Sequence, residues 1–95
     1  MILYIDTAEY NKATFSLAGK KVFKHSYVVD PRKSTDILLK LESFFKTAKV
    51  KNPKKEIKKI VIYKGTGSFT GLRVGASIGL ALSLAWGSKL TAVKK

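Results

Sequence analysis

The chain has 95 residues, and its 19 Lys or Arg residues outnumber its 6 Asp or Glu residues, which gives a formal charge of +13. This length supports a single domain, residues 1–95, with a small hydrophobic core. The absence of cysteine excludes disulfides and thiol catalysis, and it fits a cytoplasmic protein. With one histidine and six scattered carboxylates, we expect no metal site, no cofactor and no catalytic residues.

We expect no membrane span either. The longest uncharged stretch runs from Val74 to Ser88 and contains glycine. A helix that spans a bilayer needs about 20 apolar residues. This stretch is shorter, so it predicts a buried helix of a soluble domain.

The first third of the chain predicts three strands. Short apolar runs with alternating polarity cover residues 2–5, 14–17 and 22–29. The first run stops at Asp6, and Pro31 follows the third, where it removes a backbone donor from the ladder. His25 alternates with apolar residues and is expected to be an ordinary strand residue. Because the connections are short, we expect an antiparallel meander.

A helix follows the meander. Ser34 or Thr35 is a suitable N-cap. Apolar residues then recur at helical spacing and predict one buried stripe: Ile37, Leu38, Leu41, Phe44, Phe45 and Ala48. Asn52 and Pro53 interrupt this pattern.

The remaining elements alternate between strand and helix. The apolar run at 60–63 is typical of a strand covered on both faces. A second long helix is predicted from about residue 70 to 86, and a fifth strand at 90–93. The order β-β-β-α-β-α-β, with three antiparallel strands before a parallel portion, predicts an α/β fold. It is the order of a single ribonuclease H-like half-domain, the unit found in actin-like ATPases.

A glycine-rich segment, GTGSFTGLR at residues 65–73, lies between a predicted strand and a predicted helix. Free N–H groups at a helix N-terminus favour an anion, so we consider a phosphate or nucleotide site here. Its candidate residues are Asp6, Thr7, Gly65, Gly67 and Ser68. The segment matches neither a Walker A loop nor GxGxxG. A tight strand-to-helix turn with no ligand explains the same residues.

Small residues recur at every fourth position of the second helix, from Gly71 to Gly87. Such a stripe lets another backbone approach closely. It packs either against the chain's own sheet or against a partner helix. For the second alternative the expected interface residues are Gly71, Leu72, Gly75, Ile78, Gly79, Leu82, Ser83 and Trp86. We expect Leu72, Ile78, Leu82 and Trp86 to face away from the sheet.

Lysines cluster between Lys46 and Lys64 with Glu56 as their only acidic neighbour. A basic patch of this kind attracts a polyanion. The residues expected to face RNA are Lys54, Lys55, Lys58 and Lys59. No aromatic residue lies between Phe45 and Tyr63, so the patch has no platform for base stacking.

The opening MILYIDT and the segment GTGSFTGLRVG at 65–75 resemble the bacterial TsaB (YeaZ) family, the glycoprotease-like (Gcp-like, peptidase M22-like) partner proteins in the threonylcarbamoyladenosine modification of tRNA. The family pattern in the second segment is close to GPGSFTGxRxG, and Thr66 stands where Pro is usual. The resemblance implies the N-terminal half of that family, since its members have a second lobe that this chain lacks.

The resemblance also implies a function. It predicts a non-catalytic scaffold, because the histidines that bind metal in the related catalytic subunit have no counterpart after Leu90. The helix after the glycine motif is then expected to pack against its counterpart in a homodimer or in a TsaD-like catalytic subunit. Contact with tRNA is expected to be indirect or electrostatic. The alternative is a small basic RNA-binding module that acts through the lysines from Lys46 to Lys64.

Overall fold

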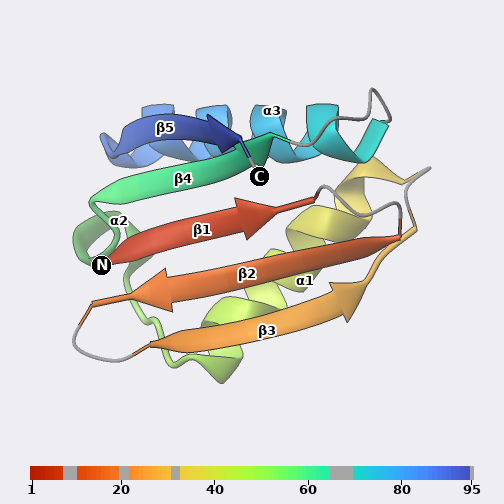
Figure 1. Ribbon diagram of the computed structural model, residues 1–95. Coiled ribbons are helices and arrows are strands. Elements are labelled where there is room, and N and C mark those ends of the chain that lie inside the picture. Colours follow the sequence, from red (N-terminus) through yellow and green to blue (C-terminus); the bar gives the residue numbers. More distant parts are fainter. Residues whose placement is uncertain (8–10, 20–21, 31–32, 65–69, 95) are drawn as a thin grey trace.

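A computed structural model describes residues 1–7, 11–19, 22–30, 33–64 and 70–94; for residues 34, 64, 70–75 and 94 it describes the backbone alone. Its elements are β1 (Ile2–Asp6), β2 (Lys12–Ala18), β3 (Phe23–Val28), α1 (Ser34–Thr47), α2 (Pro53–Glu56), β4 (Lys59–Lys64), α3 (Thr70–Trp86) and β5 (Lys89–Lys94). The strands form one sheet in the order β3-β2-β1-β4-β5 (Figure 1).

The sheet is mixed. β1 pairs with β2, and β2 with β3, in antiparallel register, whereas β4 pairs in parallel with both β1 and β5. The predicted α/β class and the succession of three antiparallel strands and a parallel portion are therefore confirmed. Each crossover between parallel strands runs through a long helix, as such connections require.

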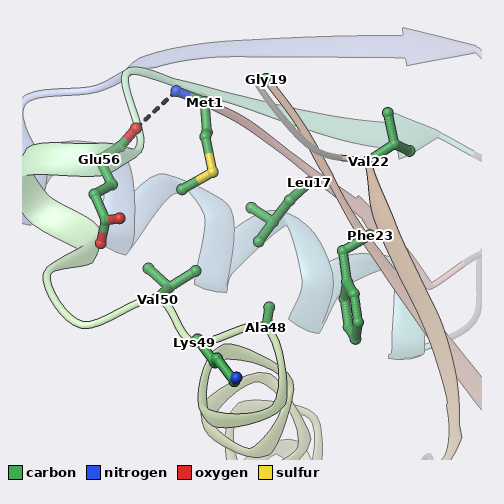
Figure 2. Close-up of a pocket in the computed structure, with 9 residues that line it drawn as sticks. All are labelled: Met1, Leu17, Gly19, Val22, Phe23, Ala48, Lys49, Val50 and Glu56. Carbon is green, nitrogen blue, oxygen red and sulfur yellow. Dashed lines mark hydrogen bonds between the residues drawn. The ribbon is translucent and has the colours of Figure 1, made fainter.

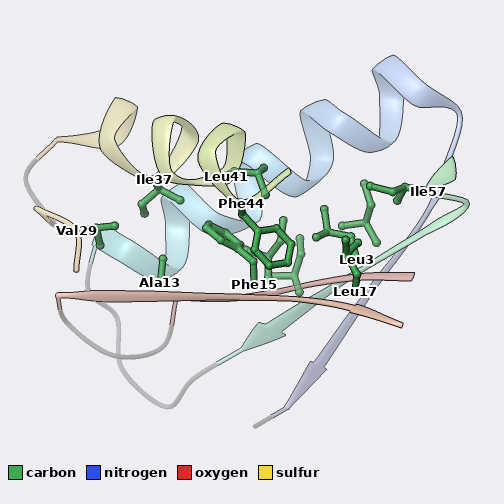
Figure 3. Close-up of a cluster of buried hydrophobic side chains, with 12 residues drawn as sticks. Leu3, Ala13, Phe15, Leu17, Val29, Ile37, Leu41, Phe44 and Ile57 are labelled. Atoms are coloured by element: carbon green, nitrogen blue, oxygen red, sulfur yellow. The ribbon is translucent and has the colours of Figure 1, made fainter. Parts of the chain in front are cut away.

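Both long helices lie on the same face of the sheet, α1 behind β1, β2 and β3, and α3 behind β4 and β5 (Figure 1). The core fills the space between these helices and the sheet (Figure 3). Strands β1 and β2 alternate between buried and half-buried residues, as the period of two demands. Their buried residues meet Ile37, Leu41 and Phe44 of α1.

One face of the sheet is therefore left without a helix among the described residues. Residues 60–62 of β4 are buried on both faces, as predicted, although no described helix covers the second face. Ile60 and Ile62 belong to the core, but Val61 points to the open face. Val61 is still only 5% exposed, because Tyr4 lies directly beside it on β1 and Thr91 on β5.

The start of α1 differs from the prediction. Lys33, and not Ser34 or Thr35, is the N-cap, and its own side chain makes no capping hydrogen bond. Instead the Asp36 carboxylate accepts the backbone N–H of Asp30 at 2.8 Å and ties the first turn to the preceding segment. Leu38 is 41% exposed, so it lies outside the buried stripe that the sequence predicts.

A short helix, α2, follows α1 at a place where the sequence pattern indicates only a break. Asn52 is the N-cap and Pro53 the first helical residue, a position where the missing N–H of proline costs nothing. The Asn52 N–H donates to the Glu56 carboxylate at 2.9 Å, so the break in one helix is also the start of the next.

Candidate functional sites

The carboxyl ends of the parallel strands β1 and β4 lie at the same edge of the sheet, and α3 begins at Thr70 after β4 leaves this edge. Three of the predicted phosphate-site residues, Gly65, Gly67 and Ser68, lie outside the described residues. The described geometry therefore concerns only Asp6 and Thr7.

Asp6 and Thr7 face opposite sides of the sheet. Thr7 continues the buried series of Leu3 and Ile5, and its hydroxyl group is buried without a hydrogen-bond partner in the described part of the chain. Asp6 instead lines a pocket of about 280 Å³ on the open face. The two side chains do not converge on one ligand atom, so strand β1 by itself builds no phosphate cradle.

The predicted orientation of α3 is wrong. Gly79 is buried against the chain's own sheet, and a Cβ atom built on it would lie 2.8 Å from Ile62 Cγ1 and 3.5 Å from Leu90 Cδ1. Glycine at this position lets the helix backbone approach β4 and β5. At Gly79 the small-residue stripe is therefore a feature of helix–sheet packing.

The other described members of the predicted interface also face inward. Ile78, Leu82 and Trp86 are half-buried and pack on the core, where the Trp86 ring lies 6.0 Å from that of Phe45 on α1. The Ser83 hydroxyl donates to the backbone oxygen of Ser88 at 2.6 Å. The surroundings of Gly71, Leu72 and Gly75 lie outside the described part of the structure.

The outward face of α3 carries different residues. Leu80 is 51% exposed and Leu84 is 77% exposed. Their neighbours on the helix are small: Ala76, Ser77, Ala81 and Ala85. Because α3 is apolar on nearly every side, its sequence does not show which side faces the sheet. In the structure, the contact of Gly79 with Ile62 defines that side.

The predicted lysine patch is divided. Lys54, Lys55 and Lys58 are exposed on and just after α2, at the end of the sheet where β1 and β4 begin. Lys59 is the first residue of β4, and the alternation of that strand places it on the open face with Val61 and Tyr63. Three of these lysines therefore lie on or next to α2, and the fourth lies on the open face of the sheet.

A larger pocket of about 670 Å³ opens between the sheet and the end of α1 (Figure 2). Its walls are mainly apolar, with Leu17 and Phe23 on the sheet side and Val50 after α1. The Met1 amino group closes one end by donating to the backbone oxygen of Glu56 at 2.7 Å. Sequence periodicity does not reveal such a pocket, because its walls come from segments that are far apart in the chain.

The described residues also bear on metal and membrane sites. Within the described ranges, no three His, Asp or Glu side chains gather in a group that is able to hold a metal ion. None of the described helices is long and apolar enough to cross a membrane. His25 lies on β3, as expected, with its ring 4.5 Å from that of Tyr27.

The same fold occurs in proteins of known structure. YeaZ from Pseudomonas aeruginosa has a TM-score of 0.82 and 21% sequence identity over 98% of this chain and 43% of that chain. A second structure, an uncharacterised protein similar to the peptidase YeaZ from Pseudomonas aeruginosa, gives a TM-score of 0.82 and 23% identity over 98% of this chain and 42% of that one. The chain thus spans less than half the length of both structures.

No curated protein sequence matches the chain. The model of the TsaD family, described as tRNA N6-adenosine threonylcarbamoyltransferase, matches residues 32–95. This match includes the glycine-rich segment and the elements α1, β4, α3 and β5. The resemblance found in the sequence is confirmed by the family model and by the YeaZ-like fold, and the chain belongs to the TsaD family of tRNA N6-adenosine threonylcarbamoyltransferases.

Proposed function

We propose that this chain is a non-catalytic scaffold subunit for the threonylcarbamoyladenosine modification of tRNA, and that it works in the cytoplasm. Its partner is a second copy of itself or a TsaD-like catalytic subunit. Membership of the TsaD family supports the link to this modification. The resemblance of residues 1–7 and 65–75 to the TsaB (YeaZ) family of partner proteins supports a role beside a catalytic subunit.

The observation that carries the proposal is the outward face of α3. Leu80 and Leu84 are large, apolar and exposed, one helical turn apart. The small residues around them allow a partner helix to approach closely, which gives van der Waals contact over a long line. Pairing of two such helices about a twofold axis would bury both leucines of each copy.

The helix α1 supplies a second apolar strip on the same layer. Leu39 is 57% exposed and Leu38 is 41% exposed. Both long helices lie on one side of the sheet (Figure 1), so a partner helix pair placed over this layer would meet leucines from α1 and α3. We therefore place the docking surface on the outer side of the helical layer.

Sedimentation velocity of the purified chain, alone and mixed with a TsaD-like subunit, tests this surface. Leu80→Gln together with Leu84→Gln should abolish association. The fold should persist, because both side chains are exposed and glutamine is a good helix former. Val22→Gln is the matched control, since Val22 is 80% exposed on the segment before β3 and should not matter.

Two results would contradict the proposal. One is that the double variant associates as strongly as the wild type. The other is that Val22→Gln weakens association as much as the double variant does. Circular dichroism of each variant shows whether a weaker association reflects a loss of helix instead.

A further inference from the structure

The open face of the sheet carries a feature that the lysine patch lacks, an aromatic pair. Tyr4 of β1 and Tyr63 of β4 are stacked, with ring centroids 6.1 Å apart and an angle of 21° between the ring planes. Both residues are half-buried, and no described helix covers them (Figure 1). Aromatic rings that stand on an open sheet are the platforms on which unpaired bases stack.

Hydrogen-bonding groups lie next to the pair. The pocket of about 280 Å³ is lined by both tyrosines together with Asp6, Thr14, Ser16 and Lys24. Thr14 and Ser26 join their hydroxyl groups at 2.8 Å across β2 and β3. Hydroxyl and carboxylate groups are able to pair with the edge of a base whose ring is stacked on tyrosine.

Cations flank this pair on the same face. Lys59 and Lys89 are paired neighbours on β4 and β5 at the end where both strands begin. Lys24 lies on the other side of Tyr4, beyond Ser16. Three lysines around two aromatic rings match the negative backbone and the unpaired bases of one strand, and the net charge of +13 strengthens the attraction.

We propose that this surface, the tyrosine face, binds single-stranded RNA: bases stack on Tyr4 and Tyr63 while phosphates pass Lys24, Lys59 and Lys89. A duplex has its bases already stacked and offers no ring to the tyrosines, so binding favours the single strand. The proposal does not depend on the docking of α3, which lies on the other side of the sheet.

Fluorescence anisotropy with a labelled ten-nucleotide oligouridine, compared with a ten-base-pair RNA duplex, tests the face. Tyr63→Leu and Tyr4→Leu keep apolar bulk and remove the ring, and each should weaken binding of the single strand about tenfold. Tyr63→Phe keeps the ring and should bind like the wild type. Thermal denaturation by circular dichroism confirms that each variant is folded at the assay temperature.

The salt dependence of binding tests the lysines. Replacing Lys24 and Lys89 by Gln should make the plot of log affinity against log salt shallower by about 0.7 for each phosphate that the protein no longer neutralises. Lys54→Gln with Lys55→Gln removes the same charge from α2, which contributes no residue to the tyrosine face, and should leave the ring-dependent loss of affinity unchanged.

Three results would overturn the proposal. The first is that the leucine variants bind the single-stranded RNA as well as the wild type does. The second is that the duplex binds more tightly than the single strand, and the third is that another protein chain covers the tyrosine face. In the last case, Tyr63→Leu would change the sedimentation coefficient and not the RNA affinity. The variant with Gln at positions 80 and 84 should still bind RNA normally, so failure of α3 docking is distinguishable from failure of this site.

Discussion

At the scale of single residues, the ends of the two long helices use the same backbone solution with different residues. After α1, Lys49 has a φ of 60°, and Val50 N–H donates to Phe45 O at 2.9 Å. After α3, Gly87 has a φ of 66°, and Ser88 N–H donates to Ser83 O at 3.2 Å. Each helix ends at a residue with a left-handed backbone conformation, and this residue is a glycine only after α3.

This difference predicts a stabilising substitution. A left-handed conformation costs an L-residue about 1–2 kcal/mol. Glycine avoids this cost, but the greater conformational entropy of its unfolded chain cancels part of the gain. Lys49→Gly should therefore raise the free energy of unfolding by about 0.5–1 kcal/mol in urea denaturation. Lys49→Ala removes the same side chain without relieving the backbone, so it should bring no such gain.

Gly87 offers the reverse test within the same experiment. No atom within 4 Å would meet a Cβ there, so Gly87→Ala changes only backbone strain. It should lower the free energy of unfolding by about 1 kcal/mol. If Gly87→Ala does not lower the free energy of unfolding and Lys49→Gly does not raise it, the left-handed backbone conformation at these two positions does not limit stability.

At the scale of secondary-structure elements, the packing of α3 on the sheet depends on Gly79. Gly79→Ala gains about 1 kcal/mol of helix propensity but pushes a methyl group into Ile62. Overpacking of a core typically costs about 1–3 kcal/mol, so we expect a net loss of stability in thermal or urea denaturation.

A double-mutant cycle separates the two effects. Ile62→Val removes the δ-methyl group that Gly79→Ala would strike, and by itself it should cost about 0.5–1.5 kcal/mol. Valine keeps the Cγ1 atom, so the contact is only partly relieved, and the double variant should lose less stability than the sum of the two single losses. Additive losses would show that Gly79 and Ile62 do not press against each other.

At the scale of the whole molecule, the sheet separates two surfaces with different chemistry. The helical layer presents Leu80 and Leu84, and the open face presents the tyrosine pair and lysines. The side chains of Asp6 and Thr7 lie on opposite sides of this sheet, and the only histidine of the chain, His25, lies beside Tyr27 on β3.

From this separation we expect the purified chain to hydrolyse no ATP. Phosphoryl transfer depends on groups that converge on one phosphate, and Asp6 and Thr7 diverge. A coupled-enzyme assay with Mg²⁺ measures the rate, with Asp6→Ala as the control for a contaminating ATPase. Metal-dependent turnover that disappears in Asp6→Ala would contradict the expectation.

Features that depend on neighbouring residues are readable from the amino-acid sequence. The alternation in β1 and β2 follows from the period of a strand, and the burial of Ile37, Leu41 and Phe44 follows from the period of a helix. The opening at residues 1–7 and the glycine-rich segment together indicate the family. These patterns involve residues that are close in the chain, so a single amino-acid sequence is enough to recognise them.

Tertiary structure alone decided which surfaces face the solvent. The helix α3 is apolar on nearly every side, so its own period does not choose a face, and the close approach of Gly79 to Ile62 does. Tyr4 and Tyr63 meet because β1 and β4 pair in parallel, although most of the chain separates them in sequence. Such pairing depends on long-range contacts, which no local pattern of residues records.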